Sequence, residues 1–170
     1  MTRLKYLGHY PAAVTAKVEN LLDQGKLAEI IIRKYPTLHD IRSDKALYAY
    51  VMELKNQHLR QSAPLSKIVY DDKIDVLHHA LGLHSFVSRV QGGQLKAKNE
   101  IRIGAVFKTA PLPFLRAIAV HELAHLREKG HNKAFYKLCE YMEPDYHQLE
   151  FDLRLYLTCL EQCGPVYGAG

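Results

Sequence analysis

Apolar residues recur at helical spacing near both ends of the chain, and the spacing changes to that of β-strands in the middle. From Ala12 to Lys34 they fall three or four residues apart with an interruption at Gly25, which predicts two short helices. Ser43 has the side chain of a helix N-cap, and we expect the next helix to end before Pro64. The first section, 12–60, is therefore predicted to be helical.

The section 65–107 shows the alternation and the β-branched residues of strands. Turn-forming residues separate the stretches KIVYDDKIDVL and KAKNEIRIGAVF, so we expect a small antiparallel sheet of at least three strands. SRVQGGQLKAKNEIRIGAVF has the pattern of a hairpin, which could bend at its double glycine or at Lys98-Asn99.

Helical spacing returns over 113–163. Prolines stand where a first helical turn tolerates them, and we expect that helix, which carries an HExxH motif, to end at Gly130. Asn132 suits the N-cap of a second helix that runs to about Met142, and Pro144 suits the first turn of a third. Helices, a sheet and further helices predict an α+β fold, with residues 1–170 in a single domain because no linker or repeat interrupts them.

Composition restricts the class of protein. Apolar residues make up 48% of the chain and charged residues 24%, as in ordinary globular proteins. No apolar run is long enough to cross a membrane, and the N-terminus lacks the apolar core of a signal peptide, so we expect a cytoplasmic protein without a membrane partner. The three cysteines are too few and too unevenly placed for a disulfide framework, and we expect reduced thiols.

Positive charge gathers on the predicted hairpin. Between residues 85 and 108 there are five basic residues and one acidic residue, which accounts for most of the formal net charge of +5. Such a patch favours an anionic ligand, although lysines that guard a solvated strand edge would produce the same pattern. The residues that could bind an anionic substrate are Arg89, Lys96, Lys98 and Arg102.

The stretch HELAHLREKGH, from His121 to His131, predicts a metal centre. Residues four apart lie on the same face of a helix, so His121 and His125 can direct two imidazoles at one ion. Glu122 lies beside that point, where a carboxylate can act as general base and take a proton from a metal-activated water molecule. These residue types at this spacing are typical of zinc hydrolases.

A catalytic zinc also needs a third protein ligand and an open position. His131 is the first candidate, because a helix that ends at Gly130 can turn the next side chain back toward the ion. The histidine spacing matches the metzincin pattern HExxHxxGxxH, but Glu128 stands where that pattern has glycine, so membership of that group is not supported. Glu140 and Glu143 on the next helix are the alternative ligands. Zn2+ suits these ligands best, and Ni2+, Co2+ or Mn2+ could occupy the same site.

A longer stretch around the motif, FLRAIAVHELAHLREKGHNKAFYKLCEYMEPDY, closely resembles the YgjP-like metallopeptidase family. SRVQGGQLKAKNEIRI and HQLEFDLRLYL extend the resemblance, and KYPTLHD and SDKALYAYVMELKNQHLR are similar to the bacterial YgjP branch. The resemblance implies a zincin-like fold in which His121, His125 and His131 hold zinc and Glu122 is the general base.

The resemblance also concerns the substrate side of the site. Phe135 and Tyr136 match aromatic positions of the family after the third histidine, and Asp145 and Tyr146 match its PDY motif. Many relatives have SRWGSC where this chain has SRVQGG, at 88–93, so a groove that used the tryptophan and cysteine would differ here.

Three functions fit these observations. The first is a zinc peptidase, in which Tyr136, Tyr141 or Tyr146 could stabilise the oxyanion. The second is a nucleotide pyrophosphatase that releases diphosphate from UTP or another nucleoside triphosphate, a reaction associated with the YgjP branch, with the basic hairpin binding the phosphates. The third is a nucleic-acid binding module, which ranks last because few aromatic residues accompany the basic ones.

Overall fold

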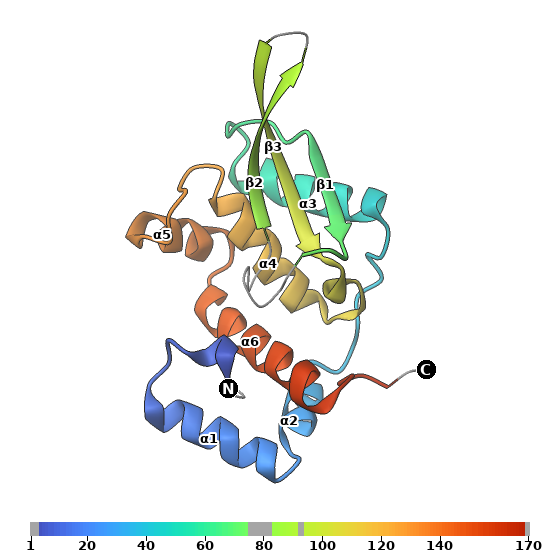
Figure 1. Cartoon of the computed structure of the whole chain (residues 1–170), viewed down its shortest axis with the longest axis vertical. Helices are drawn as coiled ribbons and strands as arrows, with labels where there is room; N and C mark the ends of the chain where they lie inside the picture. Colours follow the sequence, from blue (N-terminus) through green and yellow to red (C-terminus); the bar gives the residue numbers. More distant parts are fainter. Residues whose placement is uncertain (1–3, 75–82, 92–93, 169–170) are drawn as a thin grey trace.

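The structure, a computed structural model, describes residues 4–74, 83–91 and 94–168, and it describes the side chains of all of these except 83–91 and 94–98. Its elements are η1 (Lys5–Leu7), α1 (Ala12–Asp23), α2 (Leu27–Lys34), α3 (Asp44–His58), β1 (Lys67–Asp71), β2 (Leu83–Gln91), β3 (Gln94–Gly104), η2 (Ala105–Thr109), α4 (Leu112–Ala124), α5 (Lys133–Met142) and α6 (Tyr146–Cys163). This order confirms the predicted α+β class. Figure 1 shows the β2–β3 hairpin at one end, α1 and α2 at the other, and α4 between them.

The break at Gly25 separates α1 from α2 as predicted. Gly25 adopts a φ of 66°, a left-handed conformation that glycine reaches without a steric penalty. The amide of Lys26 donates to the carbonyl of Leu21 at 2.9 Å and the amide of Gly25 to that of Leu22 at 3.1 Å. These two bonds satisfy carbonyls at the end of α1 in a Schellman motif, and the chain then turns into α2.

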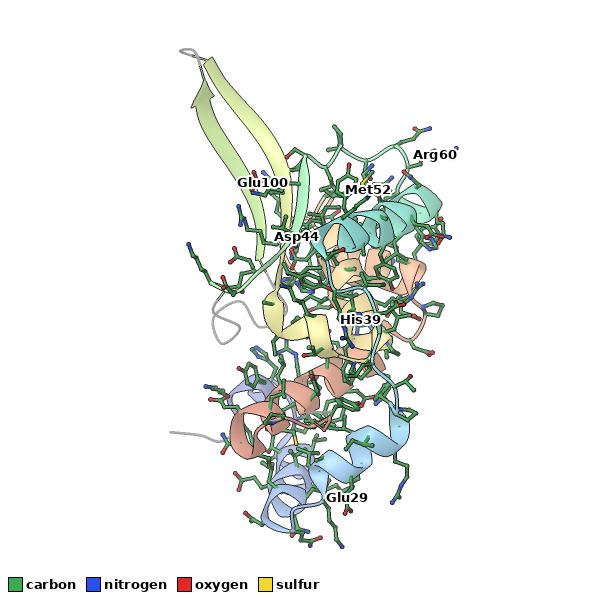
Figure 2. The ribbon with its side chains drawn as sticks, turned by 90° about the vertical axis from the view of Figure 1, so that its right-hand side faces the viewer. Glu29, His39, Asp44, Met52, Arg60 and Glu100 are labelled. Atoms are coloured by element: carbon green, nitrogen blue, oxygen red, sulfur yellow. The ribbon has the colours of Figure 1, made fainter. Side chains whose placement is uncertain are left out.

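The predicted N-cap of α3 is also confirmed. The hydroxyl of Ser43 accepts a hydrogen bond from the amide of Ala46 at 3.0 Å. The helix buries Leu47, Val51 and Leu54 and packs against β1. In Figure 2, α3 covers one side of the sheet, and His39 marks the linker from α2 where it passes α4.

The sheet is mixed, so the prediction of an antiparallel sheet was wrong for one of its two pairings. The strand order is β1-β3-β2: β2 pairs antiparallel with β3, whereas β1 pairs parallel with β3 and places Ile68 beside Ile101. The strand β3, the last along the chain, thus lies in the centre of the sheet, where its Ile101 and Ile103 are fully buried. Burial of these apolar side chains favours the central position over the edge. Lys98 and Asn99 lie within β3, and Gln91 pairs with Gln94, which excludes a bend at Lys98-Asn99.

The helix α4 is the centre of the core, because ten of its residues are buried. It begins after Pro111, with Pro113 in its first turn as predicted, but it ends at Ala124 and not at Gly130. Beyond Ala124 the backbone tightens, because the amides of Leu126 and Arg127 donate to carbonyls only three residues back. The carbonyl of Glu128 then lies 2.9 Å from Nδ1 of His125.

The last two helices pack on α4 and on each other. The side chain of Asn132 caps α5, with its Oδ1 2.8 Å from the amide of Phe135, as predicted. The helix α6 begins two residues beyond Pro144, at Tyr146. Together these elements bring the end of α4, the start of α5 and the start of α6 to one place.

Candidate metal centre

The structure brings the three motif histidines together. His121 lies in the last turn of α4, His125 ends that helix, and His131 follows in the segment before α5. Each offers one ring nitrogen, and the three nitrogens lie within 4.8 Å of one another. His121 and His125 are buried, whereas His131 is exposed, so the cluster is open on the side of His131.

Two of the rings have their Nδ1 atoms engaged outside the cluster. Nδ1 of His121 lies 2.9 Å from Oη of Tyr146, and Nδ1 of His125 lies 2.9 Å from the carbonyl of Glu128. A carbonyl only accepts, so His125 donates from Nδ1 and keeps the lone pair of Nε2 for a ligand. Bonds of this kind are what fixes the tautomer and direction of a metal-binding histidine.

The spacing of the nitrogens fits a metal ion. Nε2 of His125 lies 3.1 Å from Nε2 of His131. Two ligands of a tetrahedral zinc, at 2.0–2.1 Å each, would be separated by about 3.3 Å. This pair already has the separation of two ligands of one ion, and His121 lies within 4.8 Å of both, so the donor set suits Zn2+ and its neighbours.

The ring of Phe135 packs against all three histidine rings of the cluster. Its ring centroid lies 5.0 Å from that of His121, 4.5 Å from that of His125 and 5.0 Å from that of His131. It is fully buried, and the Asn132 cap sets the start of the helix that carries it. A phenyl ring in contact with all three imidazoles limits their rotation and excludes water from beneath them. The sequence signal for Phe135 was its position in the first turn of the helix that follows the HExxH motif.

Burial acts on the titratable groups of the centre. Burial is the largest cause that lowers the pKa of His125, and the same is true of His131. A lowered pKa favours the neutral imidazoles that bind metals. Glu122 is 1% exposed, and burial raises the pKa of its carboxyl well above the ordinary value. A cation held by the adjacent histidines would favour the ionised carboxylate that a general base requires.

The alternative ligands Glu140 and Glu143 are engaged elsewhere. Glu140 Oε1 lies 2.6 Å from Nε2 of His147. Glu143 accepts from Nε of Arg116 at 2.9 Å and from the amide of Asp145 at 3.0 Å. Among the described residues, the group that could hold a metal here consists of the three histidines.

The three tyrosines predicted as candidates lie in different environments. Tyr146 is fully buried, with its hydroxyl at His121. Tyr136 is half-buried on α5, with its ring centroid 5.2 Å from that of Phe135 and 5.5 Å from that of His147. Tyr141 is 62% exposed, and its ring packs on His58 of α3. Of the two that contact residues of the cluster, Tyr136 is the one with surface to offer to a substrate.

The predicted basic residues lie on the hairpin. Arg102 donates to Asp71 at 3.0 Å and to Glu100 at 3.4 Å, which ties it to β1 and to its own strand. The side chains of Arg89, Lys96 and Lys98 lie outside the described part of the structure. Their backbone is described, and the register pairs Arg89 with Lys96 across β2 and β3.

Sequence analysis missed a charged pair on α6 beside the cluster. Arg154 donates to Glu150 at 3.2 Å, and both side chains are largely buried. Glu150 raises the pKa of His131 and Arg154 lowers it, as charges nearby would. The sequence signal for this pair was spacing: Tyr146, Glu150 and Arg154 are four residues apart and therefore lie on one face of a helix.

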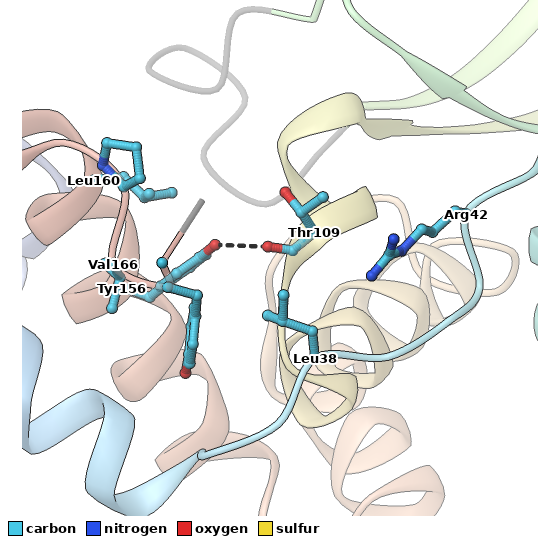
Figure 3. Close-up of a pocket in the computed structure, with 9 residues that line it drawn as sticks. Leu38, Arg42, Thr109, Tyr156, Leu160 and Val166 are labelled. Carbon is cyan, nitrogen blue, oxygen red and sulfur yellow. Dashed lines mark hydrogen bonds between the residues drawn. The ribbon is translucent and has the colours of Figure 1, made fainter. Parts of the chain in front are cut away.

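A cavity of about 320 Å3 lies elsewhere, between the C-terminal part of α6 and η2. Figure 3 shows Tyr156, whose hydroxyl donates to the carbonyl of Thr109 at 3.2 Å, facing Leu38 and Arg42 across it. It contains none of the motif histidines. In the described parts of the chain, no helix combines the length and the apolar character needed to cross a membrane.

Comparisons with known proteins identify the family of the chain. The model of the YgjP-like, metallopeptidase domain family matches residues 27–156. The chain is 58% identical over 160 residues to the UTP pyrophosphatase of Escherichia coli (strain K12), a match that covers 94% of this chain and 96% of the relative. No solved structure matches the chain. Both matches confirm the resemblance noted from the sequence, and the chain belongs to the YgjP-like metallopeptidase domain family of hydrolases.

Proposed function

We propose that the chain is a divalent-metal-dependent pyrophosphatase that hydrolyses UTP, or a related nucleoside triphosphate, to the nucleoside monophosphate and diphosphate. The observation that carries the proposal is the three-histidine cluster in a chain 58% identical, over nearly its whole length, to a UTP pyrophosphatase. Identity at this level and coverage favours the same reaction over the peptide hydrolysis in the family's name.

His121, His125 and His131 would hold the metal through their Nε2 atoms, and Zn2+ is the ion that this donor set favours. When bound, the ion supplies Lewis acidity, which acidifies water and neutralises charge on phosphate oxygens. The hydroxyl of Tyr146 orients His121, and the carbonyl of Glu128 orients His125.

Glu122 would act as general base. The oxygen of the attacking water forms a bond to phosphorus, and the bridging bond between the α- and β-phosphates breaks with its electron pair on the departing oxygen. Glu122 takes the proton that water loses and passes it to a product oxygen or to solvent. Its burial on the inner side of α4 keeps competing water away from the carboxylate.

A substrate panel tests the proposal. Metal-stripped protein is reloaded with Zn2+, Mn2+, Co2+ or Ni2+ and incubated with UTP, the other nucleoside triphosphates and casein, and the products are identified by phosphorus NMR and gel electrophoresis. We expect UMP and diphosphate from UTP, no reaction with excess chelator, and intact casein. Cleaved casein with intact nucleotides would show a peptidase instead.

A further inference from the structure

Three residues one helical turn apart form a stripe on α6 that leads away from the metal centre. Tyr146 contacts His121, and Glu150 and Arg154 follow at four-residue intervals. At 1.5 Å per residue, Arg154 lies about 12 Å along the helix axis from Tyr146. The stripe therefore extends along one face of α6 well beyond the histidine cluster.

Arg154 is held in place from two sides. Nη2 donates to Glu150 at 3.2 Å and Nη1 donates to the backbone carbonyl of Tyr6 at 3.0 Å. An arginine has five N–H groups in a fixed plane, and these two bonds occupy only part of that set. An arginine fixed in this way is prepared to donate to phosphate or ribose oxygens with little loss of side-chain entropy.

The bond to Tyr6 also brings the N-terminal segment to the site. Figure 1 shows η1 lying against α6, in agreement with their contacts. Tyr10, just after η1, packs edge-on against Phe151 of α6 with ring centroids 4.9 Å apart. Tyr10 and Tyr136 are both half-buried, so each keeps part of a ring exposed.

Ring contacts place Tyr136 and Tyr10 along one face of α6. The ring centroid of Tyr136 lies 5.5 Å from that of His147, and the ring of Tyr10 packs on Phe151 one turn later. Arg154 follows Phe151 by three residues and therefore lies on the same face of the helix. Among the charges that act on the pKa values of both tyrosines are those of Glu150 and Arg154.

The comparisons distinguish this segment from the rest of the domain. The family match begins at residue 27, beyond Tyr6 and Tyr10. The similarity to the UTP pyrophosphatase covers 160 residues, or 94% of the chain, and so must extend into the first 26. A match of 160 residues in a chain of 170 can begin as late as residue 11, so it does not by itself include Tyr6 or Tyr10. Both residues lie outside the region that defines the metallopeptidase domain.

We propose that Tyr10, Tyr136 and Arg154 form a nucleoside-binding subsite, in which the tyrosine rings stack on the base and Arg154 donates to the ribose and phosphate oxygens. This subsite rests on the proposed pyrophosphatase function and names the part of the site that recognises its substrate. Proteins that bind single-stranded nucleic acid stack the bases on aromatic rings, with contributions from arginine, and the base of a nucleotide has the same face for stacking. Glu150 has the role of holding Arg154.

Steady-state kinetics with UTP, and inhibition by its two products, test the subsite. Tyr10→Leu should raise the KM for UTP about fivefold to a hundredfold, with kcat within about threefold, because stacking on one aromatic ring contributes that much to binding. Arg154→Gln should also raise the KM, because it removes the charged donors to the ribose and phosphate oxygens. The inhibition constant of UMP should rise in parallel, whereas that of diphosphate, which lacks the nucleoside, should stay unchanged for Tyr10→Leu. Binding of UMP to metal-stripped protein, measured by calorimetry, should weaken likewise.

Matched variants control for folding. Tyr10→Phe keeps the ring and should keep the wild-type KM. Tyr48→Leu removes a tyrosine that is 41% exposed on α3, away from the histidine cluster, and should leave the KM unchanged. A Tyr10→Leu protein of wild-type melting temperature and wild-type KM would overturn the subsite but not the pyrophosphatase function. A wild type that leaves all nucleotides intact would overturn both.

Discussion

The hydrogen bond between Tyr146 and His121 gives a direct prediction about metal affinity. Tyr146→Phe removes one oxygen atom and keeps the ring that fills this part of the core. Nδ1 of His121 then loses an oxygen at 2.9 Å in a place where the histidine is only 7% exposed. Loss of an outer hydrogen bond to a metal-binding histidine weakens metal affinity about 10- to 100-fold, which equals roughly 1.4–2.7 kcal/mol.

The dissociation constant for Zn2+ measures this effect, by competition with a chromogenic chelator on metal-stripped protein. Tyr156→Phe is the matched control, because Tyr156 is 2% exposed on the same helix and its hydroxyl donates to Thr109 rather than to a motif histidine. We expect weaker Zn2+ binding for Tyr146→Phe and wild-type binding for Tyr156→Phe. Equal affinities in all three proteins would refute the view that Tyr146 orients His121.

The other predictions concern the third ligand and one buried histidine. His131→Ala should abolish stoichiometric Zn2+ binding measured by atomic absorption, whereas His147→Ala and Glu140→Gln should bind one equivalent, and retention of zinc by His131→Ala would contradict the assigned ligand set. His39 donates from Nε2 to the carbonyl of Phe107 at 2.7 Å, and burial lowers its pKa below 6.5. Because the folded state favours neutral His39, wild-type stability should fall as the pH drops below about 6.5, the unfolded value, toward the lower folded pKa. The difference in unfolding free energy between wild type and His39→Gln in urea should therefore shrink from pH 7.5 to pH 5.5, and a constant difference would count against this role.

Features set by neighbouring residues could be predicted from the sequence. The caps at Ser43 and Asn132 and the break at Gly25 depend on residues within one turn, and all three are confirmed. The pairing of His121 with His125 follows from the pitch of one helix in the same way.

Features that depend on contacts between distant residues could not be predicted from the sequence. The parallel pairing of β1 with β3 joins strands separated by the whole of β2. The end of α4 at Ala124, where the backbone changes to bonds three residues apart, had no signal at Gly130. The sequence left Glu143 open as an alternative to His131, and only the structure shows that Arg116, 27 residues away, engages that glutamate.

The environment of the substrate is the least local part of the site. Phe135 of α5 contacts His121 and His125 at the end of α4, and Arg154 meets Tyr6 across 148 positions of the chain. No spacing in the sequence relates Arg154 to Tyr6, so the histidine cluster could be predicted whereas the surface beside it needed the structure.

The rate of UTP hydrolysis by Zn2+-loaded Glu122→Gln tests the central claim most directly. Glutamine keeps the size of the side chain and removes the base, and Glu122 lies outside the set of three ligands. The variant should bind one equivalent of Zn2+ like the wild type, while kcat for release of diphosphate from UTP falls about 100- to 10,000-fold, the usual contribution of a general base. A variant that binds zinc and hydrolyses UTP within tenfold of the wild-type rate would contradict the assignment of Glu122 as the base.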